Sequence, residues 1–538
     1  MRTSRAVAVA LVAATALTGC VGTPGGTAPD GTTLRVLAGS ELGDMRPILD
    51  AAADATGVTV EFDFTGTLEG AQALADGEID GRYDAIWFSS NRYLRAMPDA
   101  ASRLGESVRI MSSPVLLGLS TPVAERLGWT TDPVGWREIG EAASRDEFTY
   151  GMTDPSASNS GFSALVGVSS ALADTGSAVD AARIESITPE LIEFFSGQTL
   201  SAGSSRWLSG AFVARATGDD PGDPVDGLIN YESELLSLGA DGTLPEPMTV
   251  IYPVDGVVTA DYPLTLLADA DDEARTAHDA LAAHLRTPEV QREITATTHR
   301  RPVVPGVEPG EQFTERNLLE LPFPATADAM DALLLAYFNT IRRPSRTLYV
   351  LDTSGSMAGD RIADLRTALT ALTGADESAL GRYRGFRNRE EITLLPFQTA
   401  PGEPETFTVP ETDREAELAR IADAAAELRA AGGTAIYDSL LTAFSLAGAS
   451  VTADPERFTS IVLMTDGENA EGRDLAEFRT AHAELPEQWR GIPVFTVPLG
   501  EGSREEMRAI ATLTGGEMFE PGEGEALAEV FHEIRGYQ

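Results

Sequence analysis

Three oxygen-bearing side chains alternate along a short stretch in the C-terminal half of the chain. Asp352, Ser354 and Ser356 directly follow the apolar run 348–351, which is typical of a strand buried in a parallel sheet. One carboxylate and two hydroxyls form an all-oxygen group, which suits a hard divalent cation. Because α/β sheets hold their ligands in loops at the carboxyl ends of parallel strands, this stretch predicts a metal site.

The stretch resembles the metal-ion-dependent adhesion site of von Willebrand factor A domains, and this resemblance implies two further ligands. They are Thr434, which comes just before a predicted helix, and Asp466, which follows the apolar run 461–464. The hydroxyls are neutral, so only two formal charges would face the ion. We expect Mg2+ or Mn2+, because a dedicated calcium site would surround the ion with more carboxylates. Ca2+ is a further candidate. The alternative is that all five residues are ordinary caps and turn residues.

The pattern Asp352-x-Ser354-x-Ser356, completed by Thr434 and Asp466, resembles the metal-ion-dependent adhesion site (MIDAS) of von Willebrand factor A domains. The resemblance implies a doubly wound, Rossmann-like α/β domain over residues 346–538. It also implies that the metal keeps an open coordination position, which an acidic residue of a protein partner can fill.

The preceding region alternates strand and helix patterns. Residues 34–38, 58–62 and 84–88 are predicted strands, which indicates βαβ units of a parallel sheet. Residues 33–345 resemble the type II periplasmic solute-binding proteins in pattern, especially the group that includes oxyanion binders. The resemblance implies an α/β domain of two lobes, the second over about 120–248. The chain would cross between the lobes near 117–122 and return near 249–262.

Polar residues that follow strands or precede helices in this region could line the cleft between the lobes. Hydroxyls and backbone N–H groups at helix N-termini bind anions without a cationic side chain. An uncharged hydroxyl lining favours an oxyanion or a sugar over a peptide. Simple helix capping is the alternative. The candidate ligand-binding residues are Ser40, Ser89, Ser90, Asn91, Ser156, Asn159, Ser160 and Tyr231.

Residues 1–20 have the form of a lipoprotein signal peptide. Two arginines precede the apolar stretch 6–17, which is too short to span a bilayer. The segment Leu17-Thr18-Gly19-Cys20 resembles the lipobox of bacterial lipoproteins, which implies that Cys20, the single cysteine, carries acyl chains such as palmitate. Residues 21–32, rich in Gly, Pro and Thr, are then a flexible tether. We expect an extracytoplasmic protein anchored to the cell membrane by its N-terminal lipid.

Composition excludes several functions. The chain has 538 residues, 83 of them acidic and 40 basic, and a formal net charge of −43, which argues against nucleic acid or an anionic bilayer as an electrostatic partner. Every basic residue is arginine, so a phosphate loop with its lysine and a Schiff base are both excluded. The chain also lacks the motifs H-E-x-x-H, G-x-S-x-G and C-x-x-C. We expect a binding protein and no enzyme.

The sequence therefore predicts a lipid-anchored binding protein with a solute-binding-like domain and an adhesion-type domain at the cell surface. Two alternatives stay open. The chain could be the solute-capture component of an ABC transporter, which a neighbouring permease gene would favour. It could also be an accessory factor that assembles or activates another enzyme, which a neighbouring AAA+ ATPase gene would favour.

Overall fold

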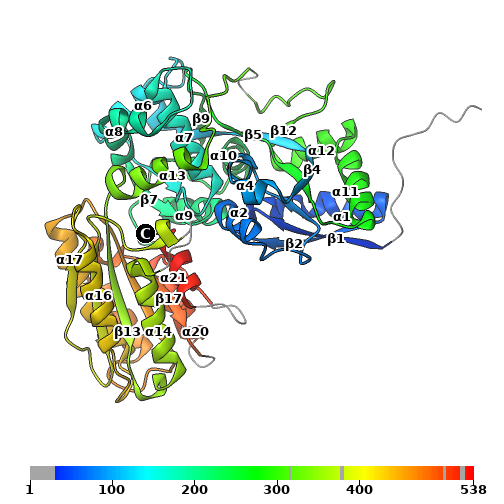
Figure 1. The fold of residues 1–538 in the computed structure, drawn as a ribbon. Helices are drawn as coiled ribbons and strands as arrows, with labels where there is room; N and C mark the ends of the chain where they lie inside the picture. The colour runs from blue at the N-terminus through cyan, green and yellow to red at the C-terminus, as the bar shows by residue number, and fades with distance from the viewer. Residues whose placement is uncertain (1–30, 314–316, 376–380, 501–503, 521–526, 538) are drawn as a thin grey trace, which may run out of the picture.

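The structure is a computed structural model that describes residues 31–313, 317–375, 381–500, 504–520 and 527–537. It shows two α/β bodies joined by a short connection at residues 342–344, with the second body below the first in Figure 1. The predicted signal peptide, Cys20 and most of the predicted tether lie outside the described residues. In the part of the chain that the structure describes, no helix is long and apolar enough to cross a membrane.

The first lobe is built on a sheet with the strand order β2-β1-β3-β11-β4. Its first three strands are parallel, as their sequence pattern predicts, and β11 returns antiparallel from the second lobe. The strands are β1 (Thr32–Ala38), β2 (Val58–Phe64), β3 (Ala85–Trp87), β4 (Leu104–Arg109) and β11 (Pro263–Leu267). The helices are α1 (Arg46–Thr56), α2 (Thr67–Asp76), α3 (Arg92–Ala96), α4 (Pro98–Ala101), α11 (Asp272–Leu285) and α12 (Pro288–Thr298).

The second lobe has a sheet with the order β10-β5-β8-β6-β7, and β9 and β12 also pair with β5. The strands are β5 (Met111–Ser120), β6 (Tyr150–Thr153), β7 (Gln198–Ala202), β8 (Gly227–Tyr231), β9 (Met248–Ile251), β10 (Thr259–Ala260) and β12 (Arg301–Pro302). The helices are α5 (Thr121–Arg126), α6 (Trp136–Ser144), α7 (Asn159–Ala173), α8 (Ala181–Ser196), α9 (Ser205–Thr217) and α10 (Glu232–Ala240).

The chain enters the second lobe earlier than the predicted crossing at 117–122. Only Ile110 separates β4, in the first sheet, from β5, in the second. The difference arises because all ten residues of β5 belong to the sheet of the second lobe. The first half of β5 pairs with β10 and β12, and the second half pairs with β8 and β9. The return at 261–262 falls within the predicted range. Helix α13 (Ala327–Ala336) and the π-helical turn Tyr337–Ile341 then lead to the second body.

The second body has a five-stranded sheet with the order β15-β14-β13-β16-β17. The strands are β13 (Ser345–Asp352), β14 (Glu391–Phe397), β15 (Glu405–Thr408), β16 (Phe458–Thr465) and β17 (Val494–Pro498). All residues of β13 are buried, as expected for a central parallel strand. The edge strand β15 is antiparallel and was not predicted from the sequence.

Helices cover both faces of this sheet. One apolar cluster joins Tyr349 and Leu351 to α14, α16 and α21, and a second joins Leu348 and Val350 to α17 and α20. The helices are α14 (Asp360–Thr370), α15 (Gly381–Arg384), α16 (Glu415–Glu427), α17 (Ile436–Ala453), α18 (Leu475–Ala483), α19 (Glu487–Arg490), α20 (Arg504–Thr514) and α21 (Leu527–Arg535). The alternation of side chains along β13 thus builds two cores, and the predicted doubly wound architecture is confirmed.

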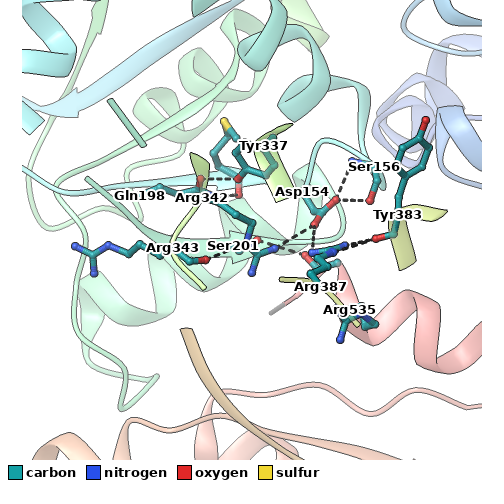
Figure 2. A network of polar contacts seen from close by, with 12 residues as sticks. Asp154, Ser156, Gln198, Ser201, Tyr337, Arg342, Arg343, Tyr383, Arg387 and Arg535 are labelled. Atoms are coloured by element: carbon teal, nitrogen blue, oxygen red, sulfur yellow. Dashed lines mark hydrogen bonds and ion pairs between the residues drawn. The ribbon is translucent and has the colours of Figure 1, made fainter. Parts of the chain in front are cut away.

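The junction between the two bodies is polar and largely buried. Figure 2 shows arginines converging on Asp154 of the second lobe, with Arg342 Nη1 and Arg387 Nη1 at 3.8 and 3.9 Å from Asp154 Oδ2. Beside them, Arg535 makes a two-point ion pair with Glu390, at 2.7 and 2.8 Å. The second body therefore packs against the second lobe through paired charges.

Candidate functional sites

The sheet of the second body brings four of the five predicted metal residues into one hydrogen-bonded group. Ser354 Oγ lies 2.9 Å from Ser356 Oγ, which donates to Asp466 Oδ1 at 2.7 Å. The backbone N–H of Ser354 donates to Asp352 Oδ1 at 2.7 Å. The group forms because β13 and β16 are adjacent and parallel, so Asp352 and Asp466 leave the sheet at the same edge.

The fifth residue, Thr434, lies beside this group. A Cβ placed on Gly467 would be 3.8 Å from both Ser356 Oγ and Thr434 Oγ1. The loop that carries Thr434 is also tied to the first one, because the N–H of Gly355 donates to the carbonyl of Gly432 at 3.1 Å. All five predicted side chains therefore gather at the carboxyl edge of the sheet.

The donor set and its spacing fit a small divalent cation. Oxygen ligands that bind Mg2+ at about 2.0–2.1 Å in octahedral geometry stand about 2.9 Å from their neighbours. The spacings in the group, 2.9 Å between the two serines and 2.7 Å from Ser356 to Asp466, are close to that value. Ser356 is exposed, so the group is open to solvent on one side. In the part of the chain that the structure describes, no group of three or more His, Cys, Asp or Glu side chains is arranged to hold a metal ion.

The electrostatics of the group are those of a site that favours positive charge. Burial raises the pKa of the Asp352 carboxyl above its ordinary value, and hydrogen bonds from Thr465 and Ser354 oppose the shift. An ion pair with Arg361 Nη1 satisfies the second oxygen of Asp466, and the arginine side chain is 49% exposed. A cation at this edge would therefore meet Arg361 as a competitor for Asp466.

In the first body, predicted ligand residues from both lobes meet in a buried polar chain. Tyr231 Oη donates to Ser89 Oγ at 2.8 Å, and Asn159 Nδ2 donates to Tyr231 Oη at 3.1 Å. Burial raises the pKa of Tyr231 well above its ordinary value, so its hydroxyl stays protonated. This series of hydrogen bonds runs from the end of β3, in the first lobe, to the start of α7, in the second, and thereby joins the lobes.

A cavity of about 400 Å3 opens in front of this chain. Of the predicted residues, Ser40 and Asn159 line it directly. Ser89 and Tyr231 lie one contact behind Asn159. The first lobe also supplies Glu41, whose pKa is raised by burial, while its own N–H and Arg300 oppose the shift.

The other four predicted residues turn toward neighbours in the fold. Ser156 donates to Asp154 at 2.5 Å, and Asn91 donates to Thr265 at 2.8 Å. The remaining two are Ser90, which accepts a hydrogen bond from the N–H of Arg92, and Ser160, which lies within hydrogen-bond distance of Thr153, Ser158 and Ser205. These four side chains are absent from the lining of the cavity, so the candidate solute site rests on the others.

Several residues that line the cavity were not among the ligand-binding residues predicted from the sequence. Glu41 directly follows the predicted Ser40 and could have been included on that ground. Arg384, Glu533 and Tyr537 come from the second body, and no local pattern relates them to the cleft.

Sequence models of two protein families match the chain. The family "Bacterial extracellular solute-binding protein" matches residues 34–297, and the family "von Willebrand factor type A domain" matches residues 346–518. The chain therefore carries a bacterial solute-binding domain followed by a von Willebrand factor A domain, as its motifs predicted. The extracellular character of the first family indicates an extracytoplasmic location, and domains of these two types are typically non-enzymatic.

Part of the chain is similar to inter-alpha-trypsin inhibitor heavy chain H4. The protein from Sus scrofa is 34% identical over 133 residues, and the protein from Homo sapiens is 31% identical over 132 residues. Each alignment covers 24% of this chain and only 13% of the relative, so the similarity is confined to a small part of those proteins.

Solved structures resemble each body in turn. The periplasmic binding protein AfuA from Actinobacillus pleuropneumoniae has a TM-score of 0.44 and 10% identity, over 58% of this chain and 98% of its own. Iron-bound HitA from Pseudomonas aeruginosa has a TM-score of 0.44 and 15% identity, over 57% and 98%. A von Willebrand factor type A protein from Catenulispora acidiphila has a TM-score of 0.28 and 19% identity, over 36% and 42%.

Proposed function

We propose that this chain is a lipid-anchored, extracytoplasmic binding protein with two ligands. Its von Willebrand factor A domain binds a divalent cation and, through it, an acidic residue of a protein partner. Its solute-binding domain binds a small molecule between the two lobes. The observation that carries the first part is the group of Ser354, Ser356 and Asp466, whose oxygens stand 2.7–2.9 Å apart at an open edge of the sheet.

The five predicted metal residues at the carboxyl edge of the sheet, here called the metal edge, each have a defined part in this proposal. Ser354 and Ser356 would bind the cation through their hydroxyl oxygens. Asp352, Thr434 and Asp466 would bind it directly or through water. The cation would supply positive charge that is only partly neutralised, since two carboxylates face it, and an acidic side chain of the partner would complete the neutralisation.

The position of the metal edge supports a role in partner binding. Strand β13 begins beside the junction with the solute-binding domain and ends at Asp352. Seven steps of about 3.3 Å place the metal edge roughly 23 Å from that junction. The predicted metal residues thus lie toward the end of β13 that is remote from the junction between the two bodies (Figure 1).

Calorimetric titration of the full-length protein with Mg2+ and Mn2+ tests the metal site. We expect binding heat from the parent and none from Asp352→Ala, while Asp364→Ala, a change at an exposed position on α14, should bind like the parent. If the five residues were only caps, Asp352→Ala would lower the free energy of unfolding by about 1 kcal/mol and leave the heats unchanged. Equal heats from parent and Asp352→Ala would end the proposal for this domain.

The lipid anchor rests on the order of signal peptide, lipobox and tether in the sequence. With the anchor at Cys20, the solute-binding domain would follow directly after the tether. The metal edge would lie on the far side of that domain's contact with the von Willebrand factor A domain.

A further inference from the structure

The cavity of about 400 Å3 has three walls, and one of them belongs to the von Willebrand factor A domain. The first lobe contributes Ser40 and Glu41, and the second lobe contributes Asn159. The third wall consists of Arg384 from α15, Glu533 from α21 and Tyr537 just after α21. The volume falls within the range of about 300–1,000 Å3 that is usual for small-molecule sites.

The third wall is held by close packing against the second lobe. The ring of Tyr537 stands nearly perpendicular to Trp207, with centroids 4.9 Å apart. A Cβ on Gly203 would lie only 2.5 Å from the Tyr537 ring. A Cβ on Gly536 would likewise lie 3.3 Å from Cβ of Ala157, in the loop before α7. The approach of the two domains therefore requires the absence of a side chain at Gly203.

An ion pair joins the same wall to the first lobe. Arg384 Nη2 lies 3.2 Å from Glu69 Oε2, on α2. The guanidinium is mostly buried, with 12% of the side chain exposed, whereas Glu69 is half exposed. The von Willebrand factor A domain thus contacts both lobes at the rim of the cavity, one through Tyr537 and the other through Arg384.

The charges around the cavity disfavour an anionic solute. Among the described lining residues, three carboxylates, Glu41, Glu69 and Glu533, face one guanidinium, Arg384, which is already paired. Burial raises the pKa of Glu41, which favours its neutral form, able both to donate and to accept a hydrogen bond. A phosphate or another oxyanion would meet net negative charge here.

The remaining lining suits a solute with many hydroxyl groups. Ser40, Thr65 and Ser204 offer hydroxyls, and Asn159 offers an amide. Phe64, a large apolar side chain that is 40% exposed, also lines the cavity. Hydroxyls and amides match the alternating donors and acceptors of a polyol, and an exposed ring covers the apolar face of a sugar.

We propose that this cavity is a composite site for a neutral polyhydroxylated solute of monosaccharide or disaccharide size, and that the von Willebrand factor A domain forms one of its walls. The proposal rests on the proposed solute-binding function and adds the solute class and the second domain. A solute in the cavity would touch all three walls, so its binding would favour the docked arrangement of the domains.

Calorimetric titration of the full-length protein with glucose, maltose, myo-inositol and inorganic phosphate tests the proposal. We expect binding of at least one of the three polyols and no binding of phosphate. Arg384→Ala removes a side chain of the third wall, and Gly203→Ala forces Tyr537 away from the second lobe. Each should weaken polyol binding about tenfold, because each removes or displaces one side chain of the wall that the solute touches.

Two further variants make the result specific. Gly210→Ala is the matched control for Gly203→Ala, because a Cβ at Gly210 meets no atom within 4 Å, and it should bind like the parent. Ser40→Ala tests the wall of the first lobe. Unchanged Mg2+ heats in every variant would show that the metal edge is intact.

The outcomes separate the composite site from solute binding in general. If Ser40→Ala weakens polyol binding while Arg384→Ala and Gly203→Ala do not, the third wall is refuted and solute binding stands. If phosphate binds and the polyols do not, the solute class is wrong. If no probe binds, both the solute class and the composite site are overturned, whereas the metal site is judged by its own titration.

Discussion

Asp154 Oδ2 lies 3.9 Å from Arg387 Nη1, so the residue that begins the loop before α7 is paired with a buried arginine of the von Willebrand factor A domain (Figure 2). The guanidinium of Arg387 lies over the ring of Phe338, 3.6 Å from its centroid. Burial and the neighbouring Arg535 lower the pKa of Arg387 to about 9, which Asp154 opposes. The carboxylate of Asp154 therefore partly neutralises the positive charges of Arg342 and Arg387 at the junction between the two bodies.

Asp154→Asn should destabilise the protein by about 3 kcal/mol. The asparagine keeps an oxygen for the hydrogen bonds from Ser156 but removes the charge that faces Arg342 and Arg387, and an uncompensated buried charge is costly. Urea unfolding of parent and variant measures the change. The control is Asp174→Asn, at an exposed helix end with a left-handed backbone that asparagine accepts. Coinciding curves for Asp154→Asn and the parent would show that these ion pairs do not stabilise the junction.

Arg361→Gln should tighten the binding of Mg2+ by up to about fivefold. Arg361, whose side chain is half exposed, pairs with the buried carboxylate of Asp466, and a cation must displace this pair, which is worth about 1 kcal/mol. The gain should shrink at high ionic strength, since exposed charges are screened. Titrations at low and high salt measure it. Arg420→Gln, which removes an exposed pair with Glu417, serves as the control. Weaker binding by Arg361→Gln would mean that the arginine helps to build the site.

Glu234→Gln should reduce the pH dependence of stability. Burial, together with Asp44 and Glu41, raises the pKa of Glu234 to about 7, although Arg300 opposes the shift. The folded protein then binds a proton that the unfolded chain has lost, so this group stabilises the fold below pH 4.5 and loses that contribution as pH rises through 7. The loss amounts to up to about 3 kcal/mol.

Scanning calorimetry at pH 5 and pH 7.5 checks this prediction. The parent should lose more thermal stability between the two values than Glu234→Gln does. Glu246→Gln, at an exposed position, should behave like the parent. An identical loss in all three proteins would place the titration elsewhere.

Cys20→Ser should release the protein from the membrane or leave its signal peptide uncleaved. Two or three acyl chains hold a protein stably on a bilayer, whereas the variant would carry none. Fractionation of cells that express parent and variant, followed by immunoblotting, measures the distribution and the apparent mass. A variant that matures and partitions like the parent would contradict the lipoprotein assignment.

The gathering of the five predicted side chains could be expected from the sequence because each comes at the end of a recognisable strand or the start of a helix. A strand that is buried on both faces must end at the sheet edge, so the residues directly after Leu351 and Thr465 emerge there. The parallel pairing of β13 with β16 then places Asp352 and Asp466 side by side. Residue type, strand pattern and the regular register of a parallel sheet thus determine the whole group.

The solute cleft was readable only in part. A polar residue before a helix can cap the backbone, bond to a neighbour or face a cavity, and its sequence position is the same in each case. Ser40 and Asn159 line the cavity, whereas Ser156 bonds to Asp154 in its own loop and Ser160, in α7, bonds to Thr153 at the end of β6. Only the packing of the two lobes decides which way each side chain turns.

The third wall was beyond the reach of the sequence. Arg384 contacts Glu69, and Tyr537 packs against Gly203. The two residues of each pair are more than 300 positions apart in the sequence, and no local pattern relates them. The sequence by itself determined the two domains and placed the five predicted metal residues after strands or before helices, because buried strands and helix starts are recognisable from short-range patterns. The tertiary structure alone decided that the domains share a cavity, because that depends on the fit of two folded surfaces and on charges that meet only after folding.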